Sequence, residues 1–387
     1  MNAREMPPLR PDFALLIDCS RYDPPLDTIT KNTASFSDDS FKEIYALSLR
    51  QGVFPLFYQR IRPFLKSGAG SQIRTLYKKS HMAYVQRNMR LSAELIRRIK
   101  EFDEKGIRAM AFKGPVLAQM AYGDITLRQY GDLDILVQKK DLIKAVSLLQ
   151  ENGYVPEIAL PLKTIDAFYS CVNVIGLHKG DLRIEIHWEL LSKNYAIDWT
   201  DEELWEKSDT VSINGTLLPT LAFETHLLYL CTHGCKHLFE RLEWICDIDR
   251  AIRSRASIDW PSLLEKAQEK GIERMVLISL YLCRELLKLP LPEEIESKMA
   301  GDTHTVGIGR RIIALNLSTG RGIRKSFGTF ALLLKMRERP SDRLRFAFRA
   351  LFAPKFDDFN TLALPKSLLF LYPVIRPFRL LVKYFRH

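Results

Sequence analysis

Three acidic residues are the side chains in this chain best suited to chemistry on a phosphate. Asp132 and Asp134 stand two positions apart in the segment Gly131 to Val137. Because side chains alternate along an extended strand, both carboxylates project from one face and Leu133 projects from the other. Two oxygen donors on one edge suit Mg²⁺, which prefers carboxylates, waters and substrate phosphates. A chance Asp-x-Asp pair is common, so the neighbouring segments decide whether this one predicts a metal site.

A third carboxylate comes from a second alternating segment, Leu182 to Leu190. The alternation places Glu185, His187 and Glu189 on one face and apolar side chains on the other. We expect Glu185 to join the two aspartates in binding two Mg²⁺ ions, which would activate an attacking hydroxyl and hold the displaced phosphate. A half-buried strand with a polar outer face is the alternative interpretation. His187 is a candidate substrate contact, or it orients Glu185.

The segment before the aspartates has the form of a phosphate-binding turn. An apolar run at 109–112 ends at Lys113 and Gly114, which predicts a strand that leads directly into a helix beginning at Pro115. The free amides at a helix N-terminus bind phosphate well, and Gly114 lets a ligand approach the backbone. We therefore predict Lys113, Gly114 and Arg128 as nucleotide-binding residues. An ordinary strand-turn-helix junction is the alternative.

Together these segments resemble the nucleotidyltransferases of the DNA polymerase beta-like superfamily. They resemble more closely an uncharacterised nucleotidyltransferase family often found in bacterial polysaccharide-biosynthesis contexts. The resemblance covers residues 80 to 260 and implies an NTP substrate, with catalytic and metal-binding carboxylates at Asp132, Asp134 and Glu185. The superfamily usually has serine or glycine after the turn glycine, where this chain has Pro115. The matching pieces are Phe112-Lys113-Gly114, Tyr122 with Arg128, Asp132 to Val137, Gly153-Tyr154 and Glu185 to Trp188.

Two further groups of polar residues fall in segments with a helical pattern. The first contains Cys231, His233, Cys235 and His237. We predict a continuous helix from 227 to 244 instead of a zinc site, because the spacing lacks four converging ligands. This helix then lines the active site, and His233 or His237 becomes a candidate substrate contact.

The second group contains Asp247, Asp249 and Arg250. Positions i and i+2 diverge on a helix, so we expect Asp247 to hold Arg250 or a neighbouring helix in place. A contact between Asp247 and the substrate is the alternative.

The composition predicts a cytoplasmic globular protein. The chain has 387 residues, of which 47% are hydrophobic and 27% are charged, and its six cysteines follow no disulfide pattern. No signal peptide or bilayer-spanning run is apparent.

The net charge of +11 comes from the last part of the chain, where residues 310–387 contain 17 Lys and Arg against 4 Asp and Glu. A solvated basic face on a helical domain is the common interpretation of such a segment. Among functional interpretations, its aromatic residues favour an anionic membrane surface, peripheral to the inner membrane, or a lipid-linked, phosphate-bearing acceptor over nucleic acid.

The order of the patterns predicts an α+β fold, with a mixed sheet flanked by helices and a helical C-terminal region. Hairpins are expected around the turn at 179–181 and around Asn214-Gly215, where Asn-Gly suits a tight turn. Long helices are expected at 72–102 and 141–153. The predicted regions are a loosely ordered leader at 1–35, a helical region at 36–105, the nucleotidyltransferase core at 106–220, a helical domain at 221–300 and a basic helical region at 301–387.

These observations favour a Mg²⁺-dependent nucleotidyltransferase that moves a nucleoside monophosphate from an NTP to a hydroxyl or phosphate acceptor and releases pyrophosphate. The acceptor context suggested by the resemblance is polysaccharide biosynthesis. One alternative is a non-catalytic nucleotide-binding or scaffold protein with the same fold. Another is a toxin-type nucleotidyltransferase that acts on tRNA or protein.

Overall fold

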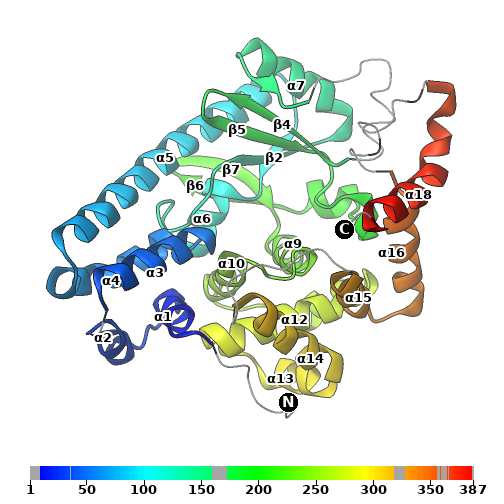
Figure 1. Cartoon of the computed structure of the whole chain (residues 1–387). Coiled ribbons are helices and arrows are strands. Elements are labelled where there is room, and N and C mark those ends of the chain that lie inside the picture. Colours follow the sequence, from blue (N-terminus) through cyan, green and yellow to red (C-terminus); the bar gives the residue numbers. More distant parts are fainter. Residues whose placement is uncertain are drawn as a thin grey trace.

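A five-stranded mixed sheet forms the centre of the fold, with the strand order β1-β2-β5-β4-β3 (Figure 1). The computed structural model describes residues 9–34, 36–158, 172–317, 327–354, 358, 364 and 366–385. Strands β2 and β5 pair parallel, and the other neighbouring strands pair antiparallel. The α+β prediction is confirmed. The strands are β1 (Ala109–Ala111), β2 (Leu133–Val137), β3 (Val155–Pro156), β4 (Val174–Lys179) and β5 (Leu182–His187).

Alternation along β2 and β5 gives the sheet two different faces. Leu133, Ile135, Ile184 and Ile186 belong to a hydrophobic core that also includes apolar residues of the long helix α5 (Ser71–Glu104) and of α7 (Leu142–Glu151). The residues between them on each strand project from the opposite face. One face is therefore closed by apolar packing, and the acidic side chains project from the other.

The two predicted hairpins are confirmed. Strands β4 and β5 pair from Val174 to His187, and β6 (Ser208–Ile213) pairs with β7 (Thr216–Leu221) in a separate two-stranded sheet. Asn214 and Gly215 have φ angles of 50° and 78°. Both positive values match the tight turn that the Asn-Gly sequence predicts. The long helices expected at 72–102 and 141–153 correspond to α5 and α7.

The leader predicted to be loosely ordered is helical over most of its described length. Helices α1 (Pro11–Ser20) and α2 (Leu26–Ala34) precede α3 (Asp38–Arg50) and α4 (Phe54–Gly68). Pro11 occupies the first turn of α1, where its missing amide costs nothing. Phe13, Leu15 and Leu16 are completely buried. The prediction was wrong because prolines that begin helices were interpreted as signs of disorder.

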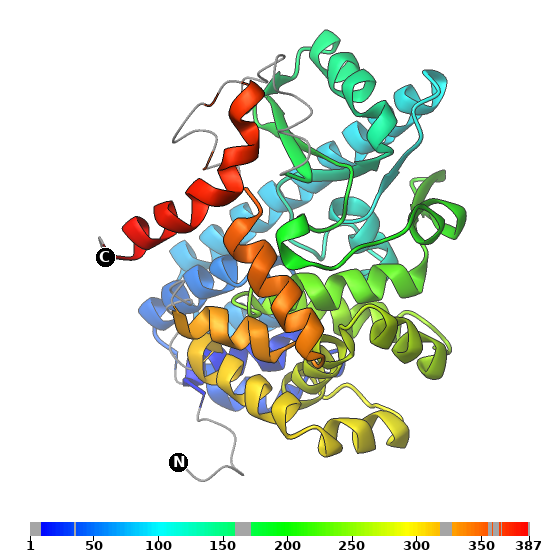
Figure 2. The same cartoon turned by 90° about the vertical axis from the view of Figure 1, so that its right-hand side faces the viewer.

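The remaining helices follow the sheet in the sequence, and most of them gather below it in the view of Figure 1, whereas the last two stand to its right (Figures 1 and 2). One hydrophobic core contains residues of α1, α3 and α4 together with residues of α9 (Phe223–Lys236), α10 (Leu242–Arg253) and α12 (Glu273–Leu282). The N-terminal and C-terminal helices therefore share one core, and the region boundaries drawn from the sequence stay predictions. The other helices are α11 (Trp260–Glu269), α13 (Glu293–Gly301), α14 (Thr303–Ile312), α15 (Phe327–Lys335), α16 (Pro340–Phe352) and α18 (Tyr372–Phe385).

The continuous helix predicted for 227–244 is wrong, because the chain turns between α9 and α10. Leu238 and Phe239 adopt positive φ angles of 52° and 49°. The ring of Phe239 folds back over Gly234, where a Cβ atom would lie only 2.2 Å from the ring. The absence of a side chain at Gly234 thus permits a sharp turn that the helical pattern concealed.

Candidate active site

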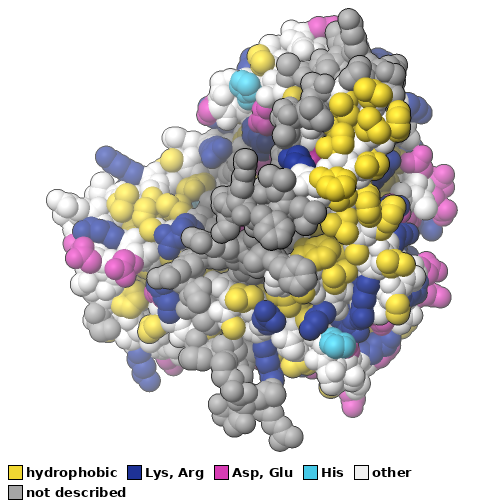
Figure 3. Space-filling model, turned by 45° about the vertical axis from the view of Figure 1, so that its right-hand side comes forward, with side chains coloured by type: hydrophobic (Ala, Val, Ile, Leu, Met, Phe, Trp, Pro, Cys, Tyr) yellow, Lys and Arg dark blue, Asp and Glu magenta, His cyan; other side chains and the backbone are white. Residues whose placement is uncertain are grey.

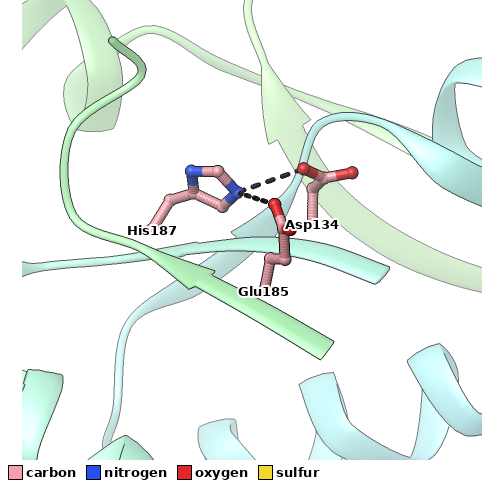
Figure 4. A group of neighbouring side chains, drawn as sticks. All are labelled: Asp134, Glu185 and His187. Atoms are coloured by element: carbon pink, nitrogen blue, oxygen red, sulfur yellow. Dashed lines mark hydrogen bonds and ion pairs between the residues drawn. The ribbon is translucent and has the colours of Figure 1, made fainter. Parts of the chain in front are cut away.

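Asp134 and Glu185 lie on adjacent, parallel strands and are paired directly in register. His187 directs its Nε2 atom at both carboxylates, at 3.1 Å from Asp134 Oδ1 and 3.3 Å from Glu185 Oε2 (Figure 4). One ligand atom from each residue lies within 4.8 Å of those of the other two, close enough for all three to reach one cation. The sequence prediction that brings Asp134 and Glu185 to one face agrees with this geometry.

Asp132 precedes β2 and lines a cavity together with Asp134 and Glu185, but a separate contact holds its carboxylate. Arg183 Nη1 donates to Asp132 Oδ2 at 3.0 Å and to Glu185 Oε1 at 2.6 Å. The Nε atom of Arg183 bonds Glu157 at 2.5 Å. A single guanidinium nitrogen thus links two of the three predicted metal ligands. The sequence reasoning missed Arg183, although its position two residues before Glu185 places it on the same strand face.

Lys113 and Gly114 have different surroundings, although they are neighbours in the sequence. Lys113 lines the cavity, and its Nζ atom lies 3.2 Å from Asp134 Oδ1. Gly114 is buried, has a φ of +53° and is not among the described residues that line the cavity. A Cβ atom on Gly114 would lie 3.2 Å from the Asp132 carbonyl oxygen. In this structure the glycine therefore allows α6 (Gly114–Tyr122) to begin close to the Asp132 segment.

Arg128 was predicted to bind nucleotide, but its guanidinium is paired with Asp247. Its Nε and Nη2 atoms bond the two carboxylate oxygens at 2.8 and 2.9 Å, and Tyr122 donates to Oδ1 at 2.9 Å. Both charged side chains are buried. Asp247 thus holds the loop before β2 against α10. Of the two partners expected for Asp247, the neighbouring helix agrees with the Tyr122 bond, because Tyr122 is the last residue of α6. Arg250 is not the partner, and its guanidinium donates to the carbonyl oxygens of Ser20 and Arg21.

A cavity of about 430 Å³ opens beside these groups. The three predicted carboxylates line it together with side chains from α5, α9 and α10, several of which the sequence did not suggest. His233 lines the cavity, whereas His187 is buried beside the carboxylates and is not among its lining residues. The predicted substrate contacts at both histidines stay predictions. The lining residues not predicted from the sequence include Tyr84, Arg87, Arg241, Glu243 and Trp244.

The electrostatic environment differs among the three carboxylates. Burial raises the pKa of Asp132 to about 6, and the neighbouring charges of Asp134 and Glu185 act in the same direction. Burial also disfavours ionisation of Asp134, but Lys113 and His187 outweigh it and hold the pKa of Asp134 well below its usual range. Burial acts to raise the pKa of Glu185, but the hydrogen bond and charge of His187 and the charge of Arg183 together outweigh it and lower the pKa. Asp134 and Glu185 are therefore ionised at neutral pH, as oxygen ligands for a cation must be.

His233 and its neighbours form an aromatic group on the helical side of the cavity. The His233 ring centroid lies 4.9 Å from that of His237 and 5.4 Å from that of Trp244. Burial lowers the pKa of His233 well below its ordinary value, so its ring is neutral near pH 7.

The described part of the chain contains one possible metal-binding group, Asp134, Glu185 and His187, and the Cys231 region is not part of it. Five described cysteines are free, and Cys171 lies outside the described residues.

Glu243 gives a pH-dependent prediction. Burial raises the pKa of its carboxyl to about 7, against the opposing effect of Arg241 and Arg128. Because this pKa is above that of the unfolded chain, about 4.3, the folded state disfavours the charged form. The resulting penalty is absent below pH 4, develops as the pH rises to 7 and is complete above it. The free energy of unfolding of Glu243→Gln minus that of wild type should therefore be larger at pH 8 than at pH 5, as measured by urea unfolding. The exposed control Glu265→Gln should show no such change, and an equal change in both variants would contradict the assignment.

Comparison with known proteins gives one family and several distant structures. The sequence model of the family described as "uncharacterised nucleotidyltransferase" matches residues 37–288. Comparison with curated proteins gives no match. Similar solved structures include the antibiotic-resistance factor ANT(2'')-Ia in solution (14% identity, 54% of this chain and 90% of that chain, TM-score 0.29). They also include ANT(2'')-Ia with adenylyl-2''-tobramycin (15%, 54% and 95%, 0.28) and an antigenic nucleotidyltransferase-like protein from Paracoccidioides brasiliensis (14%, 52% and 93%, 0.32).

Proposed function

We propose, for a chain that belongs to the family of uncharacterised nucleotidyltransferases, that the cavity beside β2 and β5 binds an NTP together with Mg²⁺. An acceptor oxygen then bonds to the α-phosphorus, the bond from the α-phosphorus to the bridging oxygen breaks, and pyrophosphate leaves. The acceptor offers a hydroxyl or a phosphate. The observation that carries the proposal is the in-register pairing of Asp134 with Glu185 beside a cavity that Asp132 also lines.

The donor set fits a hard divalent cation. Asp132, Asp134 and Glu185 offer carboxylate oxygens, which Mg²⁺ prefers, and we propose that they hold two ions. A bound Mg²⁺ supplies charge neutralisation on the phosphates and lowers the pKa of an attacking hydroxyl. His187 orients Asp134 and Glu185 through its Nε2 atom. We place His187 in a positioning role.

The other cavity residues bind and orient the substrate in this proposal. Lys113 lines the cavity beside Asp134, which places its positive charge near bound phosphates. His233 and Trp244 offer ring surfaces against which a base or sugar can pack. Arg128 acts indirectly, because its guanidinium is held by Asp247. It positions the loop that leads to Asp132.

A labelling experiment tests the reaction and identifies the acceptor. Full-length protein is incubated with each α-³²P-labelled NTP, Mg²⁺ and cell extract, because the α-phosphate is the one that the reaction transfers. We expect pyrophosphate release and label in the lipid or polysaccharide fraction, both abolished by EDTA. Label in tRNA or protein would favour the toxin-type alternative. Nucleotide binding without pyrophosphate release from any NTP would favour the non-catalytic alternative.

The proposed acceptor setting is an anionic membrane surface, on which lipid-linked, phosphate-bearing acceptors for polysaccharide biosynthesis are found. Figure 3 shows hydrophobic side chains gathered on one side of the molecule, near Lys and Arg side chains. Among the exposed large hydrophobic residues are Leu344, Phe348 and Leu351 of α16 and Val374 and Phe378 of α18, and these two helices contact each other. None of the described helices combines the length and apolar character needed to cross a bilayer. Apolar side chains within a basic segment suit binding along the surface instead.

Vesicle sedimentation tests this peripheral contact. The full chain should sediment with vesicles containing phosphatidylglycerol and much less with vesicles of phosphatidylcholine alone, because anionic lipid attracts the basic region. Phe348→Ser combined with Phe378→Ser should reduce sedimentation several-fold, since both side chains are more than half exposed. Leu217→Ser, at an equally exposed position on β7, is the matched control. Equal sedimentation of all three proteins would contradict the contact.

A further inference from the structure

Two arginines line the cavity from elements outside the central sheet. Arg87 lies on α5, and Arg241 stands immediately before the first residue of α10. Arg87 Nη2 donates to the Gly131 carbonyl oxygen at 3.1 Å. This contact places its guanidinium one residue away from Asp132. Arg241 Nη2 donates to Glu243 Oε2 at 3.1 Å, and the buried Nε atom of Arg241 has no hydrogen-bond partner.

The charges of these two arginines are less neutralised than those of the other cavity cations. Lys113 is paired with the ionised Asp134, and Arg128 is held by both oxygens of Asp247. The Arg87 contact described above is to a neutral carbonyl group. Arg241 contacts Glu243 through Nη2, and its buried Nε atom is left without a hydrogen-bond partner. Two guanidinium groups thus face the same cavity with positive charge available to a ligand.

The local backbone leaves room for this arrangement. A Cβ atom at Gly131 would lie 3.0 Å from Arg87 Nη2, so a larger residue there would push against the guanidinium.

Tyr84 lies on α5 and also lines the cavity. Burial raises the pKa of the Tyr84 phenol, while Arg87 and Arg241 both lower it. Tyr84, Arg87 and Arg241 all line this one cavity, so both guanidinium groups act on the same region of it.

We propose that Arg87 and Arg241 form a phosphate subsite next to the metal-binding carboxylates. The inference rests on the proposed function, because it assigns a role within the same cavity. A guanidinium presents paired N–H donors in a fixed plane that matches two phosphate oxygens, which a lysine cannot do. The phosphate belongs either to the triphosphate of the NTP or to the acceptor. In both cases its binding connects α5 and α10 across the substrate.

Calorimetric titration tests the subsite. Inorganic phosphate and, separately, a non-hydrolysable NTP analogue with Mg²⁺ are titrated into wild type, Arg87→Gln and Arg241→Gln. The matched control is Arg90→Gln on the same helix, because Arg90 pairs with Asp181 and is not among the cavity-lining residues. We expect Arg90→Gln to bind inorganic phosphate like wild type. Each cavity variant should bind inorganic phosphate about tenfold or more weakly. Lysine at either position should restore only part of the affinity.

The two ligands distinguish the source of the phosphate. If the subsite holds the triphosphate, the analogue displaces inorganic phosphate and loses affinity in both variants. If it holds the acceptor phosphate, inorganic phosphate binds beside the analogue and only its own affinity falls. Equal affinities of all four proteins for both ligands would overturn the subsite. Failure of wild type to bind the analogue would count against the proposed function. In that case the subsite is still supported if wild type binds inorganic phosphate and the two cavity variants do not.

Discussion

Asp134→Asn is expected to lower pyrophosphate release by roughly a thousandfold or more. Asp134 is the carboxylate that contacts both Lys113 and His187, and it lies in register with Glu185. Replacing it with a neutral amide removes a metal ligand whose effect on the transition state amounts to about 4 kcal/mol or more. Steady-state release of pyrophosphate from the preferred NTP measures this loss.

The same substitution also tests the ion pair with Lys113. Both side chains are largely buried, and loss of one partner from a buried pair typically costs about 3–5 kcal/mol. Activity is therefore measured at a temperature at which circular dichroism shows the variant to be folded. Asp181→Asn is the matched control, because Asp181 pairs with Arg90 at an exposed position. A folded Asp134→Asn protein with wild-type turnover would contradict the catalytic assignment.

Arg128→Met is expected to destabilise the fold by about 3–5 kcal/mol, because it leaves Asp247 buried without its cationic partner. Tyr122 would still donate to Asp247 but would not neutralise it. Adding Asp247→Asn to Arg128→Met should recover part of the lost stability, since no buried charge then remains. Urea unfolding of the two variants and of wild type gives these free energies of unfolding.

A surface pair provides the comparison for this experiment. Arg255 and Asp209 form an ion pair with both side chains exposed, and Arg255→Met should cost no more than about 1 kcal/mol. If Arg128 instead bound the transition state directly, Arg128→Met would keep its stability and lose activity. That result would restore the role that the sequence suggested for Arg128 and contradict its assignment as a positioning residue.

The parts of the site that the sequence predicts are those governed by local alternation. The spacing of Asp132, Leu133 and Asp134 fixes which side chains share a face. The alternation around Glu185 does the same for the second strand. The pairing of Asp134 with Glu185 between two strands is not stated by alternation, and the structure supplies it. These features depend on residue order along single strands, which a sequence states directly.

The parts that were missed depend on contacts between distant segments. The bond between Arg128 and Asp247 joins residues 119 positions apart, and Arg87 reaches Gly131 across 44 positions. The turn between α9 and α10 depends on the packing of Phe239 over Gly234. Local patterns cannot specify such partners, because the same arginine or glycine is compatible with many surroundings. Gly114 shows this well, since its close neighbour is the backbone of Asp132.

Mn²⁺ binding followed by electron paramagnetic resonance tests the central claim most directly, because Mn²⁺ accepts the same oxygen ligands as Mg²⁺. Wild-type protein with a non-hydrolysable NTP analogue should bind two Mn²⁺ ions. Glu185→Gln, which replaces one carboxylate beside Asp134 with an amide of the same size, should bind Mn²⁺ at least tenfold more weakly. Equal Mn²⁺ affinity in the two proteins would show that the paired carboxylates of β2 and β5 do not form the metal site.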